Sequence, residues 1–166
     1  MASRVLTLAL VALSALGVGA CGGDDDLSSE SGADDDGQSV DGENVHVSDA
    51  WARTSPAGVS DGATYLTIES AEGDQLVGAL VPSDIAAAVE LHGTVAGDDG
   101  AAMTMQQVSA VELPAGEAVA FEPGGLHMML VDLAGPLESG SSLKLTLIFA
   151  TSEPTTVTVD IRDEAP

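Results

Sequence analysis

The chain has 166 residues, a single cysteine and a formal net charge of −23. This length predicts one folded domain with additional segments, because about 150 residues is typical of one domain. Nucleic-acid recognition begins with a basic patch, so we expect no nucleic-acid partner for so acidic a chain. A lone cysteine has no partner for an intrachain disulfide.

The first twenty residues have the pattern of a secretion signal. Arg4 precedes an almost unbroken apolar run at 5–18, which has the length of a signal-peptide core and is short for a membrane span. The run ends in small residues directly before Cys21, and this resembles the bacterial lipobox, in which the cysteine is lipidated. We therefore predict a signal peptide at 1–20 and an extracytoplasmic protein, in the periplasm or cell envelope, lipid-anchored to the cell membrane through Cys21. The alternative is an ordinary cleavage site with a leftover thiol.

Residues 21–43 consist largely of Gly, Ser, Asp and Glu. Low hydrophobicity and repulsion between like charges predict a disordered tether. An acidic metal-binding tail is the alternative, although hard carboxylates suit calcium or magnesium. The folded domain is then expected at 44–166.

Short runs of β-forming residues recur from residue 45 onward, separated by turn residues. Alternation of apolar and polar residues is clearest at 143–147 and 155–161. Seven to nine short antiparallel strands predict an all-β fold, either a Greek-key sandwich or a small barrel. The expected strands are 45–51, 63–69, 75–81, 86–95, 102–108, 118–121, 127–133, 143–150 and 155–162.

The few aromatic residues are expected to anchor the core, with shielding of a ligand as the alternative for Trp51. They are Trp51, Tyr65, Phe121 and Phe149.

An imidazole and a thioether stand two residues apart at the head of the strand expected at 127–133. Side chains at i and i+2 of a strand share a face, so His127 and Met129 project together after a Gly-Gly turn. Met103 and Met105 have the same spacing. Thioether and imidazole donors together favour Cu(I), but methionine also fills irregular cores. From these residues alone, both a metal site and simple packing are open; His46 stands apart as a surface histidine.

Other chemistries find little support in the sequence. A blue-copper electron-transfer site needs a cysteine thiolate, and Cys21 is far in sequence from any such ligands. The common nucleophile, zinc-protease and phosphate-loop motifs are absent. We therefore expect no enzymatic activity.

The segment 123–130, PGGLHMML, resembles the periplasmic copper chaperone PCuAC family, and the likeness extends in order over 45–161. The family pattern has a His, a Met about a dozen residues later and, after 21 more residues, His-x-Met. Here 21 residues separate Met105 from His127. The interval from His92 to Met105 is one residue longer than usual, which leaves Met103 as the alternative ligand. Gly93 stands where some members have a further Met. Further similar segments are 49–53, 63–68, 89–92, 105–108 and 113–116.

The resemblance implies a cupredoxin-like fold and a carrier of copper. It also implies delivery to the binuclear copper centre of cytochrome c oxidase, in subunit II, alongside a Sco-type copper protein. The alternatives are a copper scavenger or buffer for uptake or resistance, and a non-metal β-sandwich interaction module. The ligands that it implies for one Cu(I) ion per chain are His92, Met105, His127 and Met129.

Overall fold

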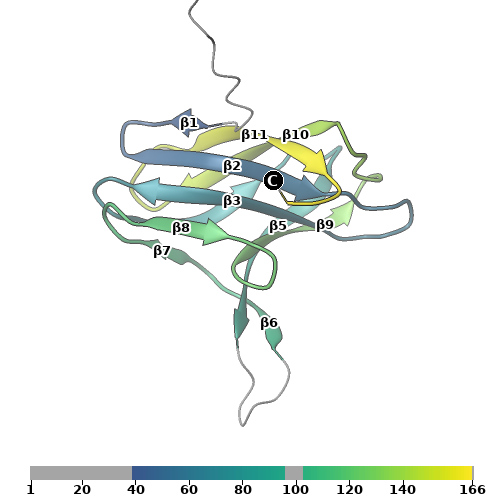
Figure 1. The fold of residues 1–166 in the computed structure, drawn as a ribbon, viewed down its shortest axis with the longest axis horizontal. Helices are drawn as coiled ribbons and strands as arrows, with labels where there is room; N and C mark the ends of the chain where they lie inside the picture. The colour runs from purple at the N-terminus through teal and green to yellow at the C-terminus, as the bar shows by residue number, and fades with distance from the viewer. Residues whose placement is uncertain (1–38, 96–102, 166) are drawn as a thin grey trace, which may run out of the picture. The chain divides into compact units, whose positions relative to one another are not determined.

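The computed structural model describes residues 39–95 and 103–165, and all of its regular structure there is β-strand (Figure 1). The prediction of an all-β fold is confirmed, with eleven strands in place of the seven to nine expected. The two strands that were not expected, β1 and β7, have two and three residues. The strands are β1 (Val40–Asp41), β2 (Val45–Arg53), β3 (Gly62–Ser70), β4 (Asp74–Leu80), β5 (Ala86–Val95), β6 (Thr104–Gln107), β7 (Val111–Leu113), β8 (Ala118–Phe121), β9 (His127–Leu133), β10 (Ser142–Phe149) and β11 (Thr155–Arg162).

The strands form one continuous hydrogen-bonded sheet in the order β6-β5-β9-β3-β2-β11-β10-β4-β7. β1 adds to β2, and β8 adds to β3. The described pairings are antiparallel except that of β2 with β11, which is parallel. Neighbours in the sheet are often distant in sequence, as in the Greek-key arrangement that was expected. In Figure 1 the end of β5 and the short strand β6 project below the rest of the sheet.

The sheet encloses one hydrophobic core, to which alternate residues of most strands contribute. On β10, Leu143, Leu145 and Leu147 are buried, and the residues between them are exposed or half-buried. Burying one such leucine contributes about 1.5–3 kcal/mol relative to leaving it exposed. The apolar positions of the alternating sequence pattern are therefore the residues of β10 that face the core.

A bulge in β2 changes which side chains of that strand face the core. The register with β3 shifts between Ser48 and Trp51, where Asp49 has a φ of 54°. An extra residue in one strand reverses which residues face inward. Trp51 consequently lies on the outer face and stacks on Tyr65, with ring centroids 4.6 Å apart.

The aromatic residues expected in the core thus divide into two groups. Phe121 and Phe149 belong to the central cluster. Trp51 and Tyr65 are also buried, 4% and 7% exposed, but as a pair on the outer face.

The N-terminal boundary of the domain differs from the prediction. Val40 and Asp41 form β1 on the edge of β2, although 21–43 was expected to be a tether. The predicted signal peptide, Cys21 and residues 22–38 of the predicted tether lie outside the described residues. Among residues 39–95 and 103–165 there is no helix of the length and apolarity that a membrane span requires.

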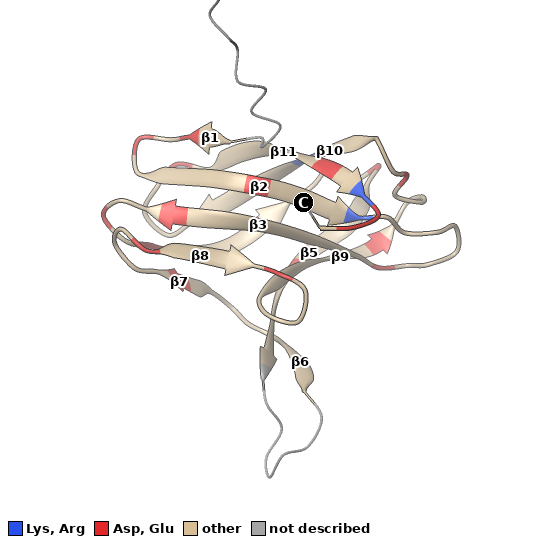
Figure 2. Ribbon diagram, viewed as in Figure 1, with Lys and Arg blue, Asp and Glu red and all other residues tan. Residues whose placement is uncertain are grey.

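Charged residues are unevenly distributed over the described domain. Figure 2 shows acidic residues along several strands and loops. Two of the basic residues, Arg53 and Arg162, are register partners at the ends of β2 and β11.

Candidate metal centre

The pairing of β5 with β9 places the two candidate histidines side by side. His92 is directly opposite His127 in the antiparallel register. Directly opposite residues of an antiparallel pair project to the same face. The ring centroids of the two imidazoles are 5.6 Å apart, and the ring planes are inclined by 40°. The sheet therefore brings together two residues that are 35 positions apart in the chain.

The turn before β9 fixes the orientation of His127. Gly124 has a φ of +85°, a conformation that glycine adopts without strain. The Gly125 carbonyl then accepts hydrogen bonds from Nδ1 of His127, at 3.1 Å, and from the Thr94 hydroxyl, at 3.2 Å. Because a carbonyl oxygen only accepts, Nδ1 of His127 bears the hydrogen, and in the neutral ring the lone pair is therefore on Nε2.

His92 is also held by one ring nitrogen, but by Nε2 where His127 uses Nδ1. Its side chain is 14% exposed, and Nε2 lies 2.9 Å from Oε2 of Glu90. The other ring nitrogen, Nδ1, is buried and has no hydrogen-bond partner among the described residues. A buried polar atom without a partner is uncommon and calls for an explanation. A soft metal ion bound at this nitrogen would supply one.

The methionines of β9 divide between its two faces. Met129 lies on the same face as His127, is half-buried and is opposite Glu90 in the register. Met128 points the other way and is fully buried in the core. Met128 therefore has a packing role.

Met105, in β6, and Met103, just before that strand, approach the same face. Met105 is opposite Thr94 in the register. This pair lies two residues along each strand from the pair of His92 and Gln107, on the same face of the sheet. Met105 and Met103 are 62% and 63% exposed. The loop in which the extra residue was expected, 97–100, lies outside the described residues.

A cavity of about 570 Å³ lies beside this face of the sheet. Met103, Met105, His127 and Met129 contribute to its lining, whereas His92 lies next to His127 and outside the lining. The structure therefore brings three of the four predicted ligands to one cavity and the fourth to its edge. The other lining residues are Arg53, Thr54, Ser55, Pro56, Val59, Asp61, Gly62, Ala63, Tyr65, Thr94, Pro123 and Gly124.

Tyr65 is a lining residue that sequence reasoning assigned to the core. Burial raises the pKa of its hydroxyl, and the positive charge of Arg53 offsets part of that increase. Tyr65 therefore presents a neutral hydroxyl at neutral pH. Its place on the outer face depends on sheet pairing, so alternation within β3 was the only sequence signal.

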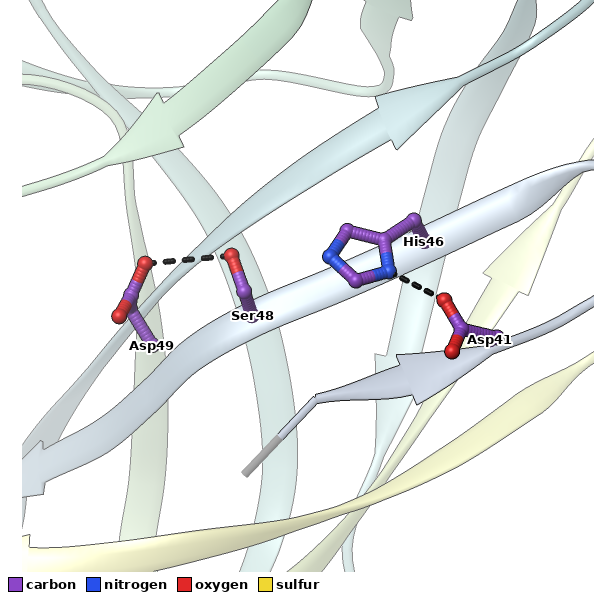
Figure 3. Close-up of polar contacts among 4 residues, drawn as sticks. All are labelled: Asp41, His46, Ser48 and Asp49. Carbon is purple, nitrogen blue, oxygen red and sulfur yellow. Dashed lines mark hydrogen bonds and ion pairs between the residues drawn. The ribbon is translucent and has the colours of Figure 1, made fainter. Parts of the chain in front are cut away.

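Other metal-binding arrangements are not formed in the described part of the chain. No group of three or more His, Cys, Asp or Glu residues there is placed to hold a metal ion. His46 is exposed as predicted, and its Nδ1 lies 2.5 Å from Oδ1 of Asp41 (Figure 3). The neighbouring Ser48 hydroxyl donates to Asp49 (Figure 3). The donors that accompany His127 in the cavity lining include the thioether sulfurs of Met103, Met105 and Met129.

Residues 45–161 match the family model described as "Putative lipoprotein LpqE-like". The chain is also 29% identical over 161 residues to "Putative lipoprotein Lxx21020" of Leifsonia xyli subsp. xyli, covering 97% of this chain and 92% of that protein.

Solved structures with similar folds are PCuAC domains and a related copper protein. The apo PCuAC domain of PmoF1 is 24% identical with a TM-score of 0.63, covering 77% of this chain and 99% of that domain. The copper-bound PCuAC domain of PmoF2 is 22% identical with a TM-score of 0.61, covering 77% and 98%. CuI-DR1885 of Deinococcus radiodurans is 25% identical with a TM-score of 0.53, covering 69% and 77%. The expected resemblance to PCuAC proteins is confirmed: the chain belongs to the LpqE-like lipoprotein family, and its β domain has the PCuAC fold.

Proposed function

We propose that this protein is an extracytoplasmic copper carrier that binds one Cu(I) ion as its cargo. The ligands in this proposal are His92, Met105, His127 and Met129. The observation that carries it is the pair of adjacent imidazoles, each with one ring nitrogen hydrogen-bonded and the other left with a lone pair.

The chemistry of the donors supports copper over other metals. Thioether sulfur is a soft donor that suits Cu(I), whereas Mg²⁺ and Ca²⁺ prefer hard oxygen ligands. Two of the similar structures are copper-bound, the PCuAC domain of PmoF2 and CuI-DR1885. A site without cysteine thiolate lacks the ligand that defines blue-copper electron transfer. These donors therefore fit transport of copper and give no support to an enzymatic role.

A competition titration against a chromophoric Cu(I) chelator tests this proposal on the full chain. We expect one Cu(I) per chain for the wild type and loss of one-to-one binding in the double variant His127→Ala, Met129→Ala. The variant His46→Ala is the matched control, because His46 is an exposed histidine bonded to Asp41. One-to-one binding retained in the double variant would place the site elsewhere. No binding by the wild type would favour a non-metal interaction module.

We further propose that the cargo is delivered to the binuclear copper centre of cytochrome c oxidase subunit II, alongside a Sco-type copper protein. A ligand set partly exposed at a cavity supports transfer by ligand exchange. Deletion of the gene should then reduce oxidase activity under copper limitation. Normal oxidase assembly with altered copper tolerance would instead identify a scavenger or buffer.

Cys21 is the proposed anchor to the membrane surface, following a signal peptide at 1–20 and preceding a tether. The match to lipoprotein relatives supports this location. Substituting Cys21→Ser should move the protein from the membrane fraction to the soluble extracytoplasmic fraction. A variant that stays with membranes would show that Cys21 is not the anchor.

A further inference from the structure

Glu90 lies beside the candidate site, two residues before His92 on the same face of β5. Its carboxylate oxygen Oε2 is 2.9 Å from Nε2 of His92. We infer that Glu90 is a positioning residue, which fixes the tautomer and ring orientation of His92 so that Nδ1 is the nitrogen offered to copper. This inference rests on the proposed function.

The hydrogen-bond chemistry gives the direction of this effect. A carboxylate accepts hydrogen bonds and donates none, so Nε2 of His92 bears the ring hydrogen. Nδ1 of His92 is buried and has no hydrogen-bond partner among the described residues. The neutral ring therefore keeps its lone pair on Nδ1, which is the form that a metal ion requires.

His127 shows the same arrangement with the two ring nitrogens exchanged. Its Nδ1 donates to the Gly125 carbonyl, which leaves Nε2 as the free nitrogen. Histidines that bind metals generally donate their other ring N–H to a carboxylate or a backbone carbonyl. In this site β5 provides the carboxylate and the turn before β9 provides the carbonyl. The two histidines are thus expected to bind copper through different nitrogens.

Two simpler roles for Glu90 fit the structure less well. As a direct ligand it would offer Cu(I) a hard oxygen in a site that has softer donors. As an ordinary surface ion pair it would bond an exposed histidine, whereas the His92 side chain is only 14% exposed. The Glu90 side chain itself is 36% exposed, so its replacement should leave the fold intact.

Three variants of the full chain test this inference by Cu(I) competition titration. Glu90→Ala removes the acceptor, and we expect Cu(I) affinity to fall about 10- to 100-fold, as for other residues that support metal-bound histidines. Glu90→Gln retains an acceptor oxygen and should lose less. Glu69→Ala, which removes one exposed carboxylate from β3, should bind as the wild type does.

Side-chain ¹H–¹⁵N NMR of the metal-free protein reads the tautomer directly. The wild type should show His92 with hydrogen on Nε2 and none on Nδ1, and Glu90→Ala should show a mixture of tautomers. A purely structural role would not change this signal. The tautomer readout needs no copper, so it tests the hydrogen bond even if the proposed function is wrong.

The outcomes separate this inference from the proposed function. Wild-type binding with Glu90→Ala within twofold of it would overturn the positioning role and leave the proposed function standing. Equal losses in Glu90→Ala and Glu90→Gln, or a loss without a tautomer change, would also overturn it, because charge or general disruption would then be the cause. A wild type that fails to bind Cu(I) would overturn the proposed function, and with it a role in copper binding for Glu90.

Discussion

Met103 and Met105 are equally exposed, but only Met105 lies in β6, where its register with the histidine strand is defined. Met105 is opposite Thr94, one step from the pair formed by His92 and Gln107. Met103 precedes β6 and is farther along the chain from Gln107. Sheet register therefore agrees with the chain spacing that favours Met105 as a ligand.

Single alanine variants at these two methionines should consequently differ. We expect Met105→Ala to weaken Cu(I) binding by at least tenfold, a loss of about 1.4 kcal/mol. Met103→Ala should remain near the wild-type affinity, since its side chain lies farther from the imidazoles. Competition titrations of both variants give the comparison, and a larger effect for Met103→Ala would reverse the assignment.

The resemblance to PCuAC proteins implied the candidate ligands at 92, 105, 127 and 129 but not their supporting contacts. The hydrogen bond from His92 to Glu90 depends on the rotamers of two side chains on the same strand, β5. The contact of His127 with the Gly125 carbonyl depends on the geometry of the turn. Neither hydrogen bond can be predicted from residue spacing alone.

At the scale of a single element, one face of β9 borders the cavity and the other packs into the core. His127 and Met129 point toward the cavity face, and Met128 and Leu130 point into the core. Because side chains alternate along a strand, copper binding and fold stability can be separated at adjacent positions.

Two neighbouring methionines on β9 make that separation measurable. Met128→Ala should lower the free energy of unfolding by about 2–5 kcal/mol, because it leaves a cavity in a fully buried position. Under conditions in which it is folded, this variant should still bind one Cu(I). Met129→Ala should weaken Cu(I) binding with a much smaller loss of stability. Chemical denaturation and Cu(I) titration of both variants check the pattern; a similar stability loss in both would contradict it.

Strands with clear alternation were predictable, but short strands and the pairing order were not. β10 and β11 were expected within one residue of their observed limits. β7 spans only Val111–Leu113, too few residues for a period to appear. The position of β5 between β6 and β9 arises from contacts between distant segments, and local patterns do not encode it.

At the scale of the whole molecule, Asp74 joins the start of β4 to the loop after β10. Its carboxylate accepts hydrogen bonds from the backbone N–H groups of Gln75, Thr151 and Ser152 and from the Thr151 hydroxyl. Burial raises the pKa of Asp74, but the hydrogen bonds from Ser152, Thr151 and Gln75 outweigh it and hold the pKa well below its usual value.

This network predicts a pH-dependent contribution to stability. Because the folded-state pKa is lowered, the ionised carboxylate stabilises the fold fully above the unfolded value of about 3.9 and progressively less as the pH falls below it. Asp74→Asn should therefore be less stable than the wild type at pH 7, and the difference should shrink below about pH 4. Urea denaturation across this range tests it, with the exposed Asp84→Asn as control. A difference that stays constant down to pH 2 would contradict the prediction.

The domain places His127, Met105 and Met129 in the lining of one cavity and His92 beside His127, and we propose that these four side chains hold Cu(I) together. Copper K-edge X-ray absorption of the full chain with one equivalent of Cu(I) tests this most directly. The spectrum should contain both imidazole nitrogen and thioether sulfur scatterers around a monovalent copper. A copper environment without sulfur, or without imidazole, would contradict the claim.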